Sequence, residues 1–383
     1  MSQLSTDARD VNGDGSVNLG GTDRVNKWER RFELHSGNTW LVERNKVLPT
    51  QGSTAERTVQ ETRSRLTGLS SNQVTQTVTI DAAGASATET VTVDRTARLR
   101  TATTQYSGVS TSASILWLNG LLFRETSASG VQTTYSHDNW ERVSKIAGRG
   151  SVEVNLSYLA GKNLIYEKSN VYYTTDRYTY DAAGRVTLHE TFNYSAVSGA
   201  RTGTARFGYN ALGQVVQRWG SAVQPVAFEF NAYGECTKIW TYPTGSSWAT
   251  STTWPGGTGN LTEWIYQAKT GLLTEKKDAN GRSTLYEYNL RHQVSKRTQQ
   301  RGTSDNVVTD YIYYDGVEAS THPSYRTGEL KTVDYPGATQ DLTYSYDRLG
   351  RTVSVDEQAA GGARTFSYRD TTDLRLAHED LPG

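Results

Sequence analysis

A short pattern recurs along this chain: two aromatic residues two positions apart, then a four-residue turn that begins with Asp or Asn and ends with Gly. One copy reads RYTYDAAGRVTLHE. Tyr178 and Tyr180 lie two positions apart, which places both on one face of a strand. Asp181 and Gly184 suit the first and fourth positions of a type I turn, and Gly accepts a positive φ. Alternation resumes after Arg185, so the pattern predicts a β-hairpin.

Further copies make the pattern a repeat. Equivalent aromatic residues lie 23 residues apart from Tyr135 to Tyr158 and 22 apart from Tyr158 to Tyr180. A unit of about 22 residues with insertions in its loops fits this spacing, and the longest insertion, residues 243–259, is expected to be a surface loop. The residues assigned to the repeat in the other copies are Tyr209, Gly213, Gly234, Tyr266, Gly271, Gly281, Tyr286, Tyr288, Tyr344, Tyr346, Asp347, Gly350 and Arg351.

Together these copies resemble the YD-repeat, or RHS-repeat, family, which includes bacterial Rhs proteins, the cocoon components of Tc insecticidal toxins and the teneurins. The resemblance extends from Gly130 to Tyr368. It implies a sheet that spirals into a hollow shell around a cargo, usually a toxic C-terminal domain of the same larger protein. Neither the shell-closing motif of the family nor a toxin module after Tyr368 is recognisable. The chain is therefore expected to supply wall and to be part of a larger protein.

The expected fold is all-β: a repeat array of antiparallel hairpins in a continuous spiralling sheet. Apolar residues do not recur at helical spacing, so no helix is predicted. A single hairpin is marginally stable in water, so successive hairpins must join into one sheet. Only 35% of the residues are hydrophobic, while 23 are Tyr and 9 are Trp, which favours a thin aromatic layer over a thick core. Residues 1–76 are expected to form a diverged N-terminal β region, and residues 77–383 the shell segment.

Charge and cysteine content exclude several classes of function. Lys and Arg number 40 and Asp and Glu also number 40, so no basic surface for nucleic acid is expected. The single Cys236 cannot form an intramolecular disulfide. No secretory signal and no stretch long enough to span a membrane is visible. We expect an extracellular or cell-surface location as part of a larger exported protein.

The N-terminal loop resembles a calcium loop of the EF-hand or dockerin kind. Its candidate ligands, at alternate positions, are Asp10, Asn12, Asp14, Ser16 and Asn18. The twelfth position, usually an acidic ligand, is Gly21, and Asp23 comes two residues later. Two interpretations remain: a calcium site, or a polar turn rich in Asx and Gly residues. No other cofactor is expected.

Nothing in the sequence predicts catalysis. The six histidines are scattered, and no zinc, phosphate-loop or serine-hydrolase motif occurs. Trp248 and Trp254 lie where several Trp residues are concentrated and either stack on sugar rings or fill strand faces and loop bases. The preferred hypothesis is a non-catalytic wall around an encapsulated polypeptide or against further shell segments. The alternative is an extracellular adhesion or carbohydrate-binding module that binds surface glycans through exposed aromatic residues.

The Arg that follows the turn Gly admits two interpretations. Arg185, Arg282 and Arg351 occupy this position in three copies of the repeat. Each either pairs with Asp or Glu on the neighbouring turn or ends in solvent.

Overall fold

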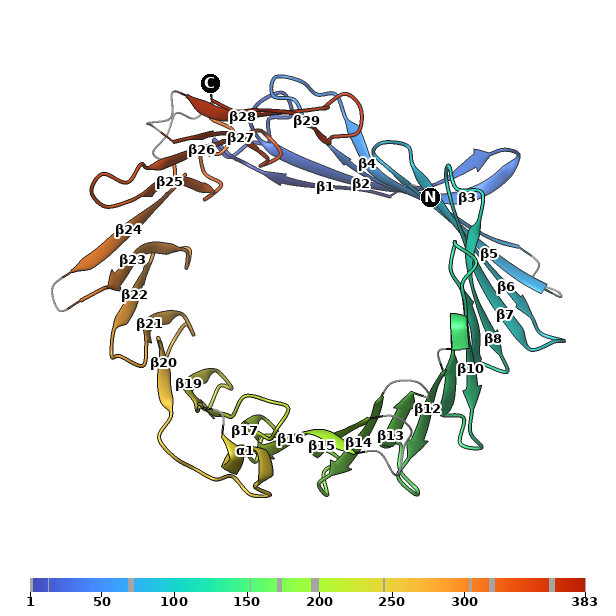
Figure 1. Ribbon diagram of the computed structural model, residues 1–383. Helices are drawn as coiled ribbons and strands as arrows, with labels where there is room; N and C mark the ends of the chain where they lie inside the picture. The colour runs from blue at the N-terminus through green and yellow to red at the C-terminus, as the bar shows by residue number, and fades with distance from the viewer. Residues whose placement is uncertain are drawn as a thin grey trace. The chain divides into compact units, whose positions relative to one another are not determined.

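The computed structural model describes residues 3–12, 14–67, 72–151, 153–170, 174–193, 200–243, 245–302, 305–316, 321–357 and 362–382. Over these residues almost all regular structure is β-strand, in one antiparallel sheet of 29 strands (Figure 1). This confirms the all-β fold class, with antiparallel hairpins in a continuous sheet.

The strands follow one another along the chain with short connections. The first eight are β1 (Gln3–Arg9), β2 (Arg24–His35), β3 (Asn38–Val47), β4 (Arg57–Thr67), β5 (Asn72–Asp81), β6 (Ser86–Asp94), β7 (Leu99–Tyr106) and β8 (Ser112–Leu118). The next are β9 (Leu121–Thr126), β10 (Gln132–His137), β11 (Val143–Ala147), β12 (Glu153–Tyr158), β13 (Ile165–Asn170), β14 (Thr174–Tyr180) and β15 (Val186–Asn193). Then come β16 (Arg201–Tyr209), β17 (Val215–Trp219), β18 (Val226–Phe230), β19 (Cys236–Thr241), β20 (Asn260–Tyr266), β21 (Leu273–Lys277) and β22 (Ser283–Tyr288). The last are β23 (Val294–Gln300), β24 (Asn306–Tyr313), β25 (Leu330–Asp334), β26 (Leu342–Tyr346), β27 (Thr352–Asp356), β28 (Ala363–Tyr368) and β29 (Leu376–Asp380).

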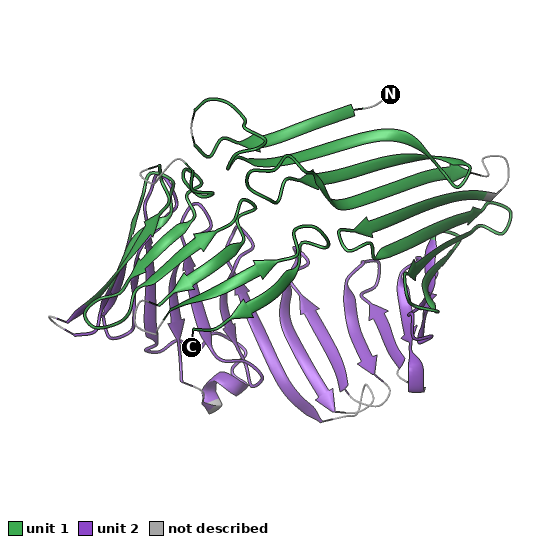
Figure 2. Cartoon of the chain, turned by 90° about the horizontal axis from the view of Figure 1, so that it is seen from above, with its two compact units in different colours: residues 1–120, 287–298, 307–383 green, residues 121–286, 299–306 purple. Residues whose placement is uncertain are grey.

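The chain divides into two compact units (Figure 2). Unit 1 consists of residues 1–120, 287–298 and 307–383, and unit 2 of residues 121–286 and 299–306. Unit 1 therefore combines the first and last parts of the chain. β5 runs through the boundary expected between residues 76 and 77, and that domain division stays a prediction.

In unit 1, β1–β8 form a meander of long strands. β2 pairs with β3 from Asn26↔Val47 to His35↔Asn38. β5 and β6 form a hairpin without tyrosines beside its turn, and Asp81 Oδ1 accepts hydrogen bonds from the amides of Ala83 and Ala85. The Asp-x-x-Gly turn thus keeps its geometry where the aromatic residues are lost.

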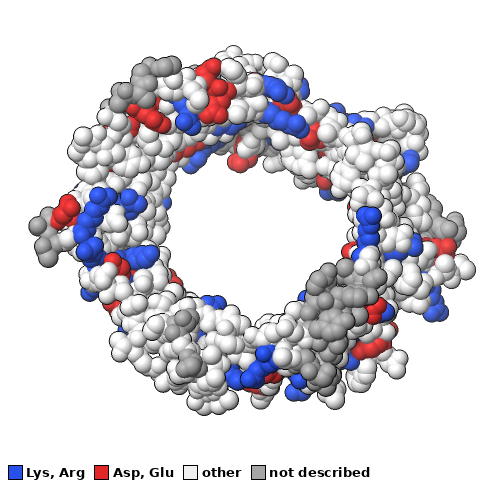
Figure 3. All heavy atoms as spheres, viewed as in Figure 1, with Lys and Arg blue, Asp and Glu red and all other residues white. Residues whose placement is uncertain are grey.

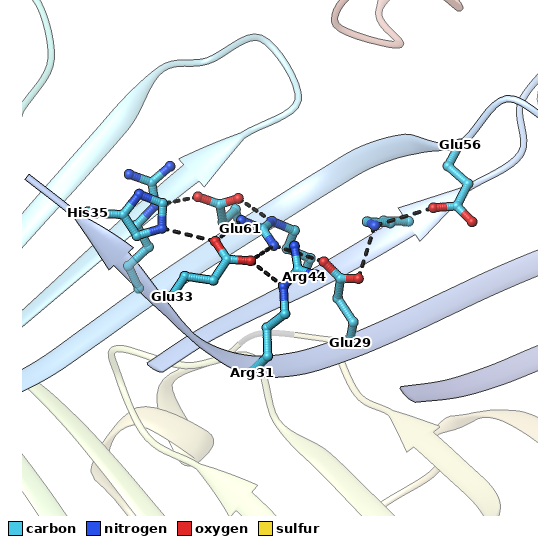
Figure 4. A network of polar contacts seen from close by, with 9 residues as sticks. Glu29, Arg31, Glu33, His35, Arg44, Glu56 and Glu61 are labelled. Carbon is cyan, nitrogen blue, oxygen red and sulfur yellow. Dashed lines mark hydrogen bonds and ion pairs between the residues drawn. The ribbon is translucent and has the colours of Figure 1, made fainter. Parts of the chain in front are cut away.

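Charged side chains on β2–β4 balance one another within unit 1 (Figure 4). Arg44 lies opposite Glu29 and Glu61 in the strand register, and it forms ion pairs with both and with Glu33. The hydrogen bond from Arg44 is the largest cause that lowers the pKa of Glu33 below its ordinary value. Opposite charges directly across strands stabilise a sheet. On the face shown in Figure 3 the described basic and acidic side chains are likewise interspersed.

In unit 2 the hairpins β12–β13, β14–β15, β16–β17, β18–β19 and β20–β21 each carry a β-bulge beside the turn. The register shifts at Tyr158, Tyr180, Tyr209, Phe230 and Tyr266, always at the last aromatic residue before the turn. A bulge bends a strand and redirects a side chain. The repeat therefore places one aromatic ring in the same irregular position at each of these five turns.

The prediction of no helix is wrong at one place. The short helix α1 (Ser246–Thr250) lies in the insertion between β19 and β20, and a 3₁₀ turn forms at Arg149–Ser151. Five residues are too few for apolar periodicity to reveal a helix. The side chain of Trp248 in α1 is 7% exposed and packs in a cluster with Trp219 and Tyr242.

Candidate functional site: the turn ladder

In each repeat turn, the side chain of the first residue accepts hydrogen bonds from main-chain amides of the same turn. In the turn at Asp181, the carboxylate Oδ1 accepts hydrogen bonds from the amides of Ala183, at 2.9 Å, and Arg185, at 3.0 Å. The amide of Gly184 donates to the Asp181 carbonyl at 3.0 Å, and Gly184 has φ 80°. The hydrogen bond from the Arg185 amide is the first cause that lowers the pKa of Asp181. An Asx side chain that binds amides two and four residues ahead fixes the turn without an apolar core.

The same geometry recurs, and we call the series of these turns from Asp138 to Asp347 the turn ladder. In every member the Asx Oδ1 accepts from the amides two and four residues ahead. The first residues of the other members are Asp138, Asn210, Asn231, Asp278, Asn289 and Asp347. The glycines assigned to the repeat all have positive φ: Gly184 80°, Gly213 84°, Gly234 86°, Gly271 69°, Gly281 77° and Gly350 83°.

Two turns have a side chain where this backbone favours glycine. Glu141 and His292 both have φ 62°. A left-handed conformation costs a residue with a Cβ about 1–2 kcal/mol. Both turns make the same hydrogen bonds as the other turns of the ladder. The turn geometry is therefore kept despite the unfavourable backbone conformation of Glu141 and His292.

The first and fifth residues of a turn are matched in chemistry. Where the first is Asp, the fifth is Arg: Arg185 Nε donates to Asp181 Oδ2 at 2.7 Å. Where the first is Asn, the fifth is an acceptor: Asn210 Nδ2 donates to Gln214 Oε1 at 2.8 Å. The pairs Asp138–Arg142 and Asp347–Arg351 follow the first rule, and Asn231–Glu235 and Asn289–Gln293 the second. Arg282 has the expected residue type after Asp278 but not the side-chain pairing. Its side chain is exposed, and only its amide donates to the Asp278 carboxylate.

The fifth residue also reaches a later turn. Arg185 Nη1 donates to the carbonyl of Asn210 at 3.2 Å, and Gln214 Nε2 donates to the carbonyl of Gly234 at 3.3 Å. Arg351 donates to the carbonyl of Leu374 and forms an ion pair with Asp370 at 2.5 Å. Pairing with a carboxylate on the neighbouring turn therefore occurs for Arg351, whereas Arg185 bonds its own Asp and a main-chain carbonyl.

Among the described residues, seven tyrosines that directly precede a turn each bind a main-chain carbonyl of an earlier part of the chain. Tyr180 Oη donates to the carbonyl of Ile165 at 2.6 Å, and Tyr209 Oη to that of Val186 at 2.7 Å. The further bonds of this kind are Tyr158–Val143, Tyr266–Cys236, Tyr313–Val294, Tyr346–Leu330 and Tyr368–Thr352. Burial raises the pKa of Tyr180 and of Tyr209, and it raises the pKa of Tyr346 to about 12. Phe230 occupies the same position but has no hydroxyl to donate.

Arg and Tyr combine into one connection between turns. The guanidinium of Arg185 lies 4.6 Å from the ring centroid of Tyr209, whose hydroxyl binds the carbonyl directly after Arg185. The same arrangement joins Arg142 to Tyr158 and Arg351 to Tyr368, each with a separation of 4.1 Å. A guanidinium over a partly buried ring adds a cation–π attraction of about 0.5–2 kcal/mol. Successive turns are thus fastened side chain to main chain.

The other aromatic residues assigned to the repeat lie on strands. Tyr178 stacks on His189 with ring centroids 4.8 Å apart. Tyr286 and Tyr288 are half-buried on β22, and the carbonyl of Tyr344 accepts a hydrogen bond from Tyr314 Oη at 2.9 Å.

In the N-terminal loop, carboxylates accept hydrogen bonds from main-chain amides of the same loop. Asp14 Oδ1 accepts from the amide of Ser16 at 2.8 Å, and Asp10 Oδ2 from the amide of Gly15 at 2.9 Å. Asp23 is fully buried, and its carboxylate accepts from the amides of Val11 and Asn18. Asp23 therefore joins the two ends of the loop. Calcium binding at Asp10, Asn12, Asp14, Ser16 and Asn18 stays a prediction.

The tryptophans of the insertion pack inward. The rings of Trp248 and Trp254 lie 4.9 Å apart, and Trp254 also contacts Trp219 and Tyr242. Trp219 Nε1 donates to the carbonyl of Ser251 at 3.1 Å, which fastens the insertion to the sheet. The burial of Trp248 against Trp219 and Tyr242 fits the interpretation that it fills a loop base, and carbohydrate binding at Trp248 and Trp254 stays a prediction.

Neither a cluster of metal-binding side chains nor a membrane-spanning helix is found among the described residues. Within them no three His, Cys, Asp or Glu side chains gather closely enough to hold a metal ion. No helix in the part that the structure describes has the length and apolarity to cross a membrane.

Comparison with known proteins supports the repeat assignment. Residues 269–304 match the model of the family described as RHS Repeat, and this segment contains the turns at Asp278 and Asn289. The match confirms, over these residues, the resemblance found in the sequence. None of the curated proteins matches the chain.

Several solved structures are similar at low identity. The crystal structure of TcdB2-TccC3-Cdc42 is 12% identical, with a TM-score of 0.36 over 96% of this chain and 24% of that chain. The Photorhabdus luminescens Tc holotoxin pore gives 12% and 0.36 over 92% and 24%. A porin-like protein from Bacteroides uniformis gives 11% and 0.22 over 58% and 91%. The chain spans about a quarter of the length of the Tc toxin chains it matches.

Proposed function

We propose that this chain is a wall segment of an RHS-repeat shell and that it acts without catalysis. The observation that carries the proposal is the turn ladder, in a chain with an RHS repeat at residues 269–304. Steps are bound to one another by strand pairing and, at several of them, by a Tyr hydroxyl on a carbonyl and by Arg over Tyr. Such redundancy suits a barrier, because one lost contact does not open a gap.

The proposed barrier separates an enclosed polypeptide from its surroundings. The enclosed partner is a segment of the larger protein to which these residues belong, and further shell segments complete the wall. A wall with balanced charge and few apolar patches binds a guest weakly, so the guest is confined by exclusion and not by affinity. We further propose that the larger protein is exported, which places the shell outside the producing cell.

Protease protection tests the proposal in the native gene product that contains these residues. The intact protein and a triple variant, Tyr158→Phe, Tyr180→Phe and Tyr209→Phe, are digested with trypsin, and peptides are followed by mass spectrometry. We expect peptides from the enclosed segment to appear slowly in the intact protein and faster in the variant. The matched control is Tyr233→Phe, whose ring is 80% exposed at a turn tip.

Equally fast digestion of every adjoining segment in the intact protein contradicts an enclosing role. Protection that the triple variant leaves unchanged contradicts the role of the turn ladder in it.

A further inference from the structure

The largest fully buried side chain in the described part of unit 1 is an arginine at a turn tip. Arg348 is the second residue of the turn that begins at Asp347, and it is 1% exposed. At the same position the other turns of the ladder have Asn139, Ala182, Ala211, Ala232, Ala279 and Leu290. Leu290 is fully exposed. Arg348 therefore departs from the repeat in both residue type and burial.

The guanidinium of Arg348 is held by main-chain carbonyls of the N-terminal region. Nε donates to Asp23 O at 2.7 Å and Nη2 to Leu19 O at 2.8 Å. Nη1 donates to Thr50 O at 3.2 Å and to Ser53 O at 3.1 Å. These four carbonyls come from two separate loops that flank β2 and β3. A planar guanidinium with its fixed fork of N–H groups fits such a set, and the three-donor ammonium of Lys does not.

An ion pair beside Arg348 joins the same two regions. Arg24 contacts Glu329 with both terminal nitrogens, and the Nη2–Oε2 distance is 2.8 Å. Glu329 also accepts hydrogen bonds from the hydroxyls of Ser324 and Thr327. Gly350 leaves room for this pair, because a Cβ there would lie 2.9 Å from Glu329 Oε1. We call the four carbonyls with Arg348, together with the Arg24–Glu329 pair, the clasp.

The clasp coincides with the deepest burial on the N-terminal side. Val11, Val25 and Leu48 are at most 1% exposed, and Asp23, whose carbonyl binds Arg348, is fully buried. Elsewhere the described sheet buries few side chains completely. The last repeats contribute Arg348 and Glu329 to this region from about 300 residues later in the chain, so neither region completes the site alone.

We propose that the clasp is a lock that fastens the first and last parts of the wall to each other and that engages only after both have folded. The proposal rests on the proposed wall function. Contacts between residues about 300 positions apart have the largest loop-closure entropy to overcome, so they form late in folding. During synthesis the clasp cannot form, so unit 1 stays open. Once the last repeats exist, the clasp holds the two parts of unit 1 together.

Hydrogen exchange on the full chain tests the lock. The amides of Val11 and Asn18, which bind the Asp23 carboxylate, report the clasp. The amides of Ala183 and Arg185, bound to Asp181, report unit 2. In Arg348→Ala we expect at least roughly tenfold faster exchange at the first pair and no change at the second. Arg348→Lys should resemble Arg348→Ala, and the exposed Arg282→Ala is the matched control.

Pulse labelling during refolding tests the order of events. We expect Val11 and Asn18 to gain protection after Ala183 and Arg185 in the native sequence. If Arg348→Ala does not fold, Glu329→Gln gives the same comparison with a milder change. Unchanged exchange at Val11 and Asn18, equal acceleration in both units, or early protection of Val11 overturns the lock. Failure of the protease-protection test with these results intact would refute the wall function alone.

Discussion

Replacing Tyr180 with Phe removes one hydroxyl and leaves the ring in place. The deleted bond joins Tyr180 Oη to the carbonyl of Ile165 at 2.6 Å, and both residues are half-buried. A neutral hydrogen bond contributes about 0.5–1.5 kcal/mol net, and a carbonyl left partly unsatisfied adds to the loss. We therefore expect the opening of this step to become easier by about 1–2 kcal/mol, which is a factor of roughly 5–30.

Native-state hydrogen exchange is the suitable assay, because a repeat array does not unfold in two states and local opening is read directly. The amides of β13 and β14 should exchange roughly 5–30 times faster in Tyr180→Phe, while strands of unit 1 keep their rates. Tyr233→Phe, which changes an exposed ring by the same atom, should leave all rates unaltered. If Tyr180→Phe behaves like this control, the hydroxyl bond does not hold the steps together.

Three further predictions follow from the turns and the charged clusters. Gly184→Ala should destabilise its hairpin by about 1–2 kcal/mol because φ is 80°. Glu141→Gly should stabilise its own turn by up to about 1 kcal/mol. A stabilising Gly184→Ala or a destabilising Glu141→Gly in denaturation would contradict the turn geometry. The pKa of Glu33 lies below its ordinary 4.5, so its stabilising effect is complete above about pH 4.5 and is lost as pH falls through the folded-state value. Glu33→Gln should thus be less stable than the native chain near pH 7, by a margin that shrinks in acid; a margin independent of pH refutes this. Calorimetric titration with Ca²⁺ should release heat with the native chain and none with Asp14→Ala; equal heats, or none, would rule out the loop as a calcium site.

The hairpins and their turns could be predicted because each depends on residues close in sequence. Tyr178 and Tyr180 at a spacing of two, with Asp181 and Gly184 after them, indicate strand and turn by chemistry alone. The hydroxyl of Tyr180 is different, since its acceptor is the main-chain carbonyl of Ile165, 15 residues earlier. Every residue has such a carbonyl, so no side chain marks the acceptor in the sequence.

The burial of individual side chains could be predicted least well from the sequence. The abundance of Trp in the insertion fits an exposed platform and a packed cluster equally, and only the fold shows that Trp248 faces Trp219 and Tyr242. Arg348 carried a usable signal, because a charged residue stands where related turns have Ala or Asn. That departure points to a contact outside the repeat but cannot identify its partner about 300 residues away.

The central claim is that one turn is fastened to another through Arg, Tyr and a main-chain carbonyl. A double-mutant cycle with Arg185→Gln and Tyr209→Leu tests it most directly, because the guanidinium lies 4.6 Å from the ring centroid. Opening free energies come from the exchange of amides in β15 and β16. We expect a coupling of about 0.5–2 kcal/mol between the two side chains. Additive effects of the two substitutions, with no coupling, would contradict the claim.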